Sequence, residues 1–563
     1  MDIQVPIMIQ DPQIAKYRGV ARIVEKPHVD EEFFLDGPVS KRVAVLDFDP
    51  DTGKLMRPVS FQRPSRRRKG RYKIANEENV YKPTFDVYAP DFIAVSVFGT
   101  VLSTMYMFEE EDTLGRDLVW AFDGPQLLVV PRAGEWANAF YERDSRSLQF
   151  FYFPNPENRR ETVYTSLSRD IVSHETGHAI LDSIAPHLYD AITPQCLALH
   201  EAVADLTAAL MAFRSGSLTT AILDETKGSI RESNDFSSIA EEFGMARYQL
   251  GYLRNLLNEE TLDDVDHDQP HALSQVLSGA LYKVMVQMHE DRKVEYSAGD
   301  PSRELSVSGK ALAVAAKQFK RMIFRALDYL PPGEVSYADY GRAIIAADQA
   351  SHPDDEQERV WIRDEFVRRG MAPDRAALEV PTMYEYGPLQ DVDLDTLLES
   401  DFVAYLFADS NRKFLHIPRR IPFHVEPRLR VRKLYYHRDG PRQVEECLFK
   451  VSWSSIEANG AGFGLPRERQ ITIGTTLAID WDTKLVRALM TSDTSGRPKE
   501  QDEQREDRDL MLARLADQDV LRFGHLAMGP GGKPLRSVIP AVSTGDLMRV
   551  HGTGRMLHVI GEV

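Results

Sequence analysis

Apolar residues recur along the chain with two different periods. From about residue 161 to 372 they follow the helical period, as in ALHEAVADLTAALMAF and HALSQVLSGALYKVMVQM, which predicts a mainly helical unit. Up to about residue 75, and again from about residue 428, shorter apolar runs such as RQITIGTTLAIDW predict strands. The segment from 76 to 160 mixes both patterns. We therefore expect a fold of the α+β class.

A length of 563 residues is more than one hydrophobic core normally serves, so several units are expected. The changes of pattern predict five segments: a β-rich extension at 1–75, a β-rich lobe at 76–160, a helical lobe at 161–372, a connector at 373–427 and a β-rich accessory domain at 428–563.

The formal net charge of -18 disfavours broad attraction to nucleic acid or to anionic lipid. One run, RPSRRRKGRYK at 63–73, departs from this balance and is interpreted as an exposed basic loop. A nucleic-acid role for this run stays an alternative. It would use Arg66, Arg67, Arg68, Lys69, Arg71 and Lys73, with Tyr72 between them.

The N-terminal residues MDIQVPIMIQDPQIAKYRGV lack a basic stretch followed by a long apolar run, so no signal peptide is expected. We expect no membrane span, because no segment is predicted to approach the required 18 apolar residues. The two cysteines, Cys196 and Cys447, are too few for a disulfide framework. These features favour a cytoplasmic protein.

The segment RDIVSHETGHAILDSIAPHLYD holds two histidines at a metal-binding spacing. On a helix, His174 and His178 lie one turn apart on the same face and can bind one metal ion. Glu175 is placed to contact a metal-bound water. The pattern alone is also compatible with a helix that carries two polar histidines, so a third ligand is needed.

The segment LHEAVADLTAAL supplies that ligand. Catalytic zinc generally takes three protein ligands and keeps one position for water. Glu201 opens a second predicted helix, and Asp205 lies on the same face, where it can accept the free ring N–H of a ligand histidine. His200 is an alternative ligand, although it points to a different side of that helix.

Together these motifs resemble the gluzincin metallopeptidases, and specifically the thermolysin-like family, which has an HExxH motif and a His-His-Glu zinc site. The family pattern HExxHAxxD is met from His174 to Asp182, and NExxSD appears as HEAVAD. The resemblance covers about residues 81–372. It implies a two-lobed core, with the zinc site in the cleft between a β-rich lobe and a helical lobe.

The resemblance also implies roles for residues outside the zinc ligands. Tyr189 matches a tyrosine that stabilises the oxyanion, and the DxxxxHxxS segment gives His271 the same task, with Asp266 orienting it and Ser274 completing the pattern. The sequence NAF, at Asn138, Ala139 and Phe140, matches an edge strand that binds the substrate backbone. Arg231 is the candidate for an arginine that contacts the substrate carbonyl.

Family members are usually secreted with a propeptide and carry structural calcium. Asp170 matches a calcium ligand, but the expected later carboxylates are replaced by AALMAFRSGSLTT, so structural Ca²⁺ is not predicted. Whether residues 1–75 are an inhibitory prosegment or a permanent domain stays open, and a permanent domain is favoured.

The sequence thus predicts a zinc metalloendopeptidase that binds one catalytic Zn²⁺ and acts on peptides or proteins, with Glu175 as general base. The alternative is a protease-like binding or regulatory protein without activity. No membrane partner is expected. The C-terminal region is expected either to recruit a target or to stabilise the core.

Overall fold

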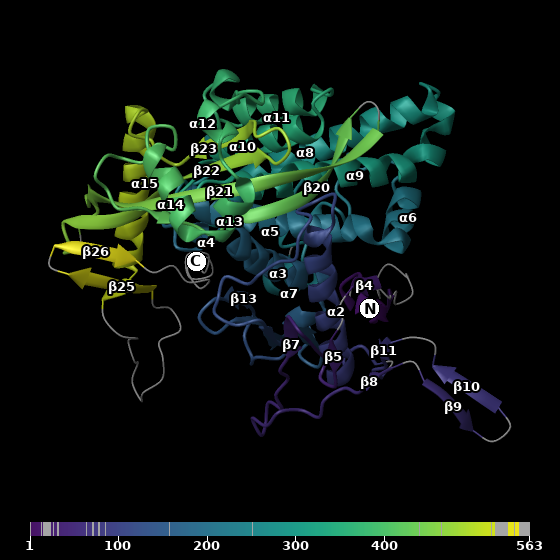
Figure 1. Ribbon diagram of the computed structural model, residues 1–563. Coiled ribbons are helices and arrows are strands. Elements are labelled where there is room, and N and C mark those ends of the chain that lie inside the picture. The colour runs from purple at the N-terminus through teal and green to yellow at the C-terminus, as the bar shows by residue number, and fades with distance from the viewer. Residues whose placement is uncertain are drawn as a thin grey trace.

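The protein is described by a computed structural model. The described residues run from 2 to 550, except for 13, 15–23, 26–27, 31–32, 64, 70–71, 77–78, 85, 157, 250, 438–439, 463, 519–520, 524–538 and 545. The fold is mixed α+β, as expected. Figure 1 shows most of the early strands in its lower part, the later helices at the top, and α3 and α5 between them.

A six-stranded sheet forms the centre of the lower part. Its order is β13-β14-β12-β7-β6-β5. The strands span Ala139–Glu142, Ser147–Phe150, Leu127–Val130, Val43–Val45, Val39–Ser40 and Phe34–Leu35, respectively. β7 pairs in parallel with β12, so residues on both sides of the boundary expected near 75 build one sheet. Among the described residues, the first 75 positions thus contribute β5, β6 and β7 to this sheet and do not form a separate extension.

A smaller sheet with the order β4-β1-β11-β8 lies in the same lobe. These strands span His28–Asp30, Asp2–Gln4, Asn79–Tyr81 and Phe61–Gln62. Helix α2, Pro90–Glu109, packs between the two sheets and the helical part, and it shares the main hydrophobic core with Ile3, Val5 and Ile7. Short strand pairs complete the lobe: β2, Ile7–Met8, with β3, Val24–Glu25, and β15, Tyr152–Pro154, with β16, Thr162–Tyr164.

The basic run is a β-hairpin rather than the expected loop. β9, Ser65–Lys69, pairs antiparallel with β10, Tyr72–Asn76, and the hairpin projects from the body in Figure 1. The side chains of Arg66, Arg67, Arg68, Lys69, Tyr72 and Lys73, and all of Arg71, lie outside the described residues.

The helical part follows the sequence prediction closely. Its helices are α3, Arg169–Ile184; α4, Pro186–Tyr189; α5, Pro194–Arg214; α6, Gly216–Glu225; α7, Glu241–Tyr248; α8, Pro270–Ser297; α9, Glu304–Tyr329; α10, Tyr337–Ser351; and α11, Gln357–Arg368. One short strand pair, β17, Ser238–Ile239, with β18, Arg254–Asn255, interrupts them. α5 packs between α3 and α8, and α8 packs on α9.

The expected connector also folds. It contains α12, Gly387–Gln390; α13, Leu394–Glu399; and α14, Asp401–Ser410. These helices cover one face of an eight-stranded C-terminal sheet. The sheet contains β19, His424–Val425; β20, Leu429–His437; β21, Gly440–Ala458; β22, Glu468–Asp480; β23, Val486–Thr491; β24, Leu521–Phe523; β25, Ile539–Thr544; and β26, Leu547–Val550, with helix α15, Pro498–Asp517, beside it.

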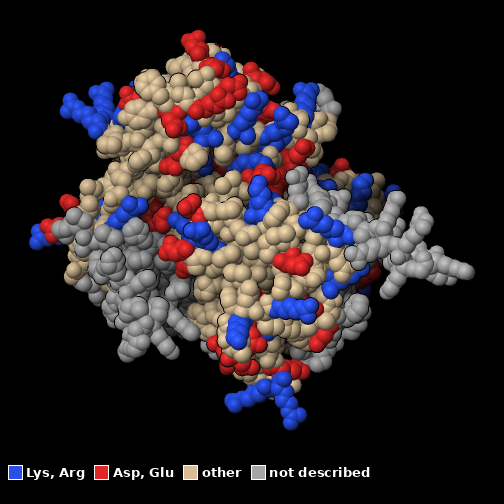
Figure 2. Space-filling view, turned by 60° about the horizontal axis from the view of Figure 1, so that its bottom comes forward, with Lys and Arg blue, Asp and Glu red and all other residues tan. Residues whose placement is uncertain are grey.

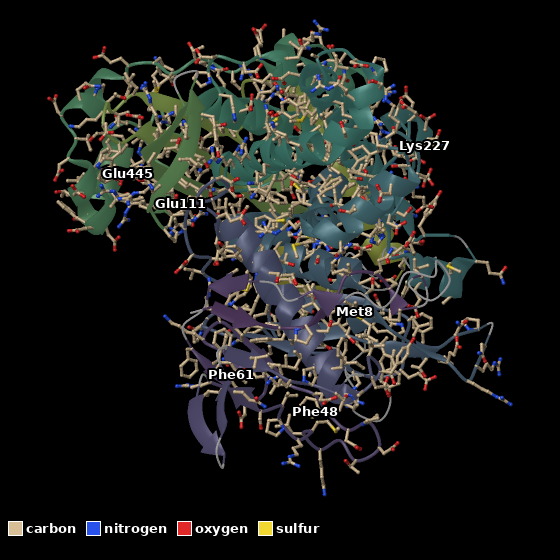
Figure 3. The ribbon with its side chains drawn as sticks, turned by 90° about the vertical axis from the view of Figure 1, so that its right-hand side faces the viewer. Met8, Phe48, Phe61, Glu111, Lys227 and Glu445 are labelled. Carbon is tan, nitrogen blue, oxygen red and sulfur yellow. The ribbon has the colours of Figure 1, made fainter. Side chains whose placement is uncertain are left out.

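The other face of this sheet is continuous with the main core. Val431, Leu448 and Ala478 belong to the same buried cluster as the helices around α5. The Leu434 N–H donates to the carbonyl of Glu111 at 3.0 Å, and Figure 3 shows Glu111 beside the strands that carry Glu445. The C-terminal sheet is therefore integrated with the rest of the molecule and does not sit apart as an accessory domain.

Two helices are longer and more apolar than the sequence analysis allowed. α2 and α5 have the length and composition of membrane spans, but 89% and 94% of their most apolar windows are buried inside the protein. Core helices of soluble proteins have the same properties, so this is weak evidence for a span. Both cysteines are buried too, Cys196 on α5 and Cys447 on β21.

Candidate metal centre

The centre is built by the close packing of α3 on α5. Ser168 caps α3, its hydroxyl accepting from the Ile171 N–H, and fixes where the helix begins. At Gly177 an added Cβ would lie 3.1 Å from Thr207 Oγ1 and 3.2 Å from Ala204 Cα. The missing side chain at Gly177 therefore lets the histidine face of α3 approach the carboxylates of α5.

His174, His178 and Glu201 converge at this contact. The two histidine Nε2 atoms are 3.1 Å apart, and each lies 3.4 Å from one carboxylate oxygen of Glu201. All three side chains are buried, and ring nitrogens lie 3.3–3.4 Å from the oxygens of Glu201. These contacts are long for hydrogen bonds, and a cation between the ligand atoms would satisfy the buried carboxylate and both histidine nitrogens.

The donor set fits a metal ion. The three candidate ligand atoms lie within 4.8 Å of one another. Among the described residues, this is the group of His, Cys, Asp or Glu side chains that could hold a metal ion. Two imidazoles and one carboxylate are typical of catalytic zinc sites.

Asp205 supports the first histidine, as expected. Its Oδ1 lies 2.9 Å from His174 Nδ1, so it orients the ring with Nε2 toward Glu201. Arg254, on β18, donates to the same oxygen of Asp205 at 2.8 Å. Although burial opposes it, Arg254 and His174 hold the pKa of Asp205 below its usual value.

His200 lies behind the second histidine and not among the ligand atoms. Its Nδ1 is 3.4 Å from the Nδ1 of His178, on the side of that ring opposite Nε2. Burial holds the pKa of His200 well below its usual value, so the ring is neutral. His200 is therefore suited to orienting His178, and the alternative of His200 as a ligand is not favoured by this geometry.

Glu175 lies against the edge of the six-stranded sheet. Its Oε2 accepts from the Tyr141 N–H at 3.0 Å, and burial raises the pKa of its carboxyl group. A raised pKa suits a group that must accept a proton and later return it.

β13 is an edge strand, as expected for the NAF segment. Among the described strands it pairs with β14 alone, and the Asn138 carbonyl accepts from the Phe151 N–H on that side. The N–H groups of Tyr141 and Arg143 point the other way, toward Glu175 and Tyr189. The Ala139 N–H bonds only the side-chain oxygen of its neighbour Asn138, at 2.8 Å, so this edge of the strand can accept an extended chain.

Tyr189 is held at the end of β13. Its hydroxyl accepts from the Arg143 N–H and donates to Glu142, both at 3.2 Å. Its ring centroid is 6.2 Å from that of His200, which in turn contacts His178. Tyr189 is thus near the centre, with its hydroxyl engaged by the strand.

His271 reaches the centre, but Asp266 does not contact it. The Nε2 of His271, at the start of α8, lies 3.3 Å from Glu201 Oε2. Asp266 is exposed, and in the described part of the chain no hydrogen bond or ion pair joins its carboxylate to His271. The orienting role expected of Asp266 is therefore absent from this arrangement.

Arg231 is not at the centre. Its side chain is 66% exposed and pairs with Glu290 at 3.1 Å. Arg254 lies there instead, 2.8 Å from Asp205 and 3.8 Å from Glu201. The sequence signal that could have found it is the single charged residue in the otherwise uncharged stretch QLGYLRNLLN, which precedes the histidine-bearing helix α8.

Asp170 faces an arginine. Its carboxylate pairs with the guanidinium of Arg169 at 3.0 Å, near the buried carboxylate of Asp11. Burial raises the pKa of Asp170, and Arg169 opposes that effect.

Comparison with known proteins adds no further information. No protein-family model matches the chain, and no curated protein matches it either.

Proposed function

We propose that the protein is a zinc-dependent endopeptidase of the thermolysin-like type, with a two-lobed catalytic core. The observation that carries this proposal is the convergence of His174, His178 and Glu201 next to the buried carboxylate of Glu175. The outer edge of β13, where the Ala139 N–H bonds the side chain of Asn138, supports a peptide as the substrate, because backbone pairing holds an extended chain without demanding its sequence. A cytoplasmic location is part of the same proposal.

Each residue then has a defined task. Zinc held by His174, His178 and Glu201 would supply Lewis acidity and lower the pKa of a bound water. Glu175 takes the proton from the attacking water and passes it to the leaving amine. His271 donates to the carbonyl oxygen as that oxygen gains charge.

One assignment differs from the sequence analysis. Arg254, rather than Arg231, is the cation available to a substrate carbonyl. Tyr189 is the second oxyanion donor, and its hydroxyl must leave Glu142 when substrate binds. Removing one such donor raises the barrier by about 3 kcal/mol.

The test combines metal analysis with cleavage. Wild type and Glu175→Gln are purified, bound zinc is measured, and cleavage of a mixed peptide pool is followed. Both proteins are expected to bind about one zinc, and only wild type should cut. Absence of zinc from wild type, or equal cutting by Glu175→Gln, would overturn the proposal. Zinc binding without any cleavage would favour the inactive, binding-protein alternative.

A nucleic-acid role receives less support. Among the described side chains on the face in Figure 2, acidic and basic residues are interspersed. The net charge of -18 also opposes it.

A further inference from the structure

A cavity lies between α3, the helix that carries His174 and His178, and the C-terminal sheet. It has a volume of about 390 Å³ and is bounded by the end of α3, by α4, by the end of α9 and by β21. Its walls are mainly apolar. They include Leu118, Trp120, Ile184, Leu188, Leu330 and Leu448. This volume is in the range of cavities that hold small molecules.

Lys450 of β21 brings a charge into this apolar cavity. Its ammonium group donates to the carbonyl of Leu330 at 3.1 Å, and among the described residues no carboxylate lies within ion-pairing distance. An ammonium group has three donors, so this one retains unused hydrogen-bonding capacity. Burial lowers the pKa of Lys450 to about 8, which leaves it mostly charged at neutral pH.

Apart from Asp117, the other charged groups of the wall already have partners. Asp328 pairs with Arg116 at 2.7 Å and with Lys433 at 2.8 Å. Glu426 pairs with His187 at 3.2 Å. Asp117 is exposed. Lys450 is therefore the charge that a ligand can neutralise.

We propose that this cavity binds a small carboxylate with an apolar body, whose carboxylate group bonds the ammonium group of Lys450. The apolar walls would bury the body of the ligand, and the charge-assisted hydrogen bond would fix its orientation. Two sources share this chemistry: a free carboxylic acid, and the C-terminal carboxylate of a peptide that ends in an apolar residue.

Calorimetric titration of the full chain with octanoate tests the proposal. Octanoate should bind wild type at least tenfold more tightly than Lys450→Met, whereas octanol, which lacks the charge, should bind both proteins alike. Lys450→Arg should retain most of the affinity. Lys484→Met is the matched control, because this exposed lysine also bonds a backbone carbonyl, that of Gln390, outside the cavity.

A second series identifies the source. N-acetyl-Leu-Leu is compared with its C-terminal amide and with octanoate. Tighter binding of the peptide acid, lost in the amide and in Lys450→Met, would assign the cavity to peptide C-termini, and tighter binding of octanoate would assign it to free acids. The proposal is overturned if neither acid binds, or if both bind Lys450→Met as tightly as they bind wild type.

Discussion

At the residue scale, the centre depends on how its buried charges are paired. Glu201 and Asp205 bring two negative charges into the interior, and Arg254 brings one positive charge within 4 Å of both. An unpaired charge in such a place costs several kcal/mol, so each of these groups stabilises the others. Replacing Arg254 therefore tests this pairing of buried charges most directly.

Replacing Arg254 with Met should reduce kcat/KM for peptide cleavage by about 100-fold, because a charged hydrogen-bond donor is lost beside the reacting carbonyl. Steady-state kinetics with zinc analysis measures this effect. Arg231→Met is the control and should keep wild-type kinetics, since Arg231 is exposed and pairs only with Glu290. The opposite ranking of the two variants would restore Arg231 to the site.

Burial of Glu358 on α11 predicts a pH dependence of stability. Burial and Asp355 raise the pKa of Glu358 to about 7. Because this value exceeds that of the unfolded chain, about 4.3, the free energy of unfolding should fall as pH rises between these two values.

Glu358→Gln removes this titration and should stabilise the protein at pH 8 by on the order of 1 kcal/mol, after allowance for its partner Arg292, with little effect at pH 4.5. Denaturant unfolding at both pH values measures the difference. Glu295→Gln, an exposed partner of the same arginine, serves as control and should show no such pH dependence. A stabilisation equal at both pH values would contradict the assignment.

At the element scale, the proposed function assigns substrate binding to the edge strand β13. Ala139→Pro removes one outward N–H, so the Michaelis constant for a peptide should rise about fivefold, the loss of one neutral hydrogen bond. Thermal stability should change little, because that N–H is not part of the ladder with β14. Kinetics and thermal unfolding check both parts, and a large loss of stability would show that the strand edge has another structural role.

The helices were the easiest elements to predict. α5, α8, α9 and α10 follow from the period of apolar residues. The spacing of His174, His178 and Glu201 also predicted the group of candidate metal ligands. These features are local or depend on fixed helical geometry. The basic hairpin was missed because its strands carry few apolar residues to mark a buried face.

Arg254 and Asp266 show where sequence reasoning fails at the site. Neither position is set by helical spacing from the ligands: Arg254 reaches Asp205 through the strand pair of β17 and β18. Motif matching placed Asp266 beside His271, yet that carboxylate faces solvent. Contacts made across separate elements require the tertiary structure.

At the scale of the whole molecule, the expected divisions near residues 75 and 428 are crossed by the core. β7 pairs with β12 in one sheet, and Val431 and Leu448 share the main hydrophobic cluster. Lys433 is 1% exposed and lies 2.8 Å from Asp328 of α9, which ties the C-terminal sheet to the helical part. Local sequence patterns could not reveal this continuity. On both sides of each expected boundary they show ordinary strand or helix periods, which do not indicate which elements pack together.

Lys433→Met should therefore destabilise the whole protein by about 3 kcal/mol, because it removes a buried cation that pairs with the buried carboxylate of Asp328. Calorimetry should show one transition, shifted to lower temperature, with zinc released in the same transition. Arg432→Met is the neighbouring control on the exposed face and should cost less than about 1 kcal/mol. Two separate transitions, with zinc release unaffected by the change, would mean that the sheet unfolds independently.

The burial of both cysteines has a practical consequence. Burial raises the pKa of the Cys196 and Cys447 thiols to about 12, so almost no thiolate forms at neutral pH. The folded chain is consequently inert to maleimide reagents. A cysteine introduced at exposed Phe402 on α14 would be the sole labelled position, so a fluorophore there would report the distance to a labelled substrate without any background to subtract.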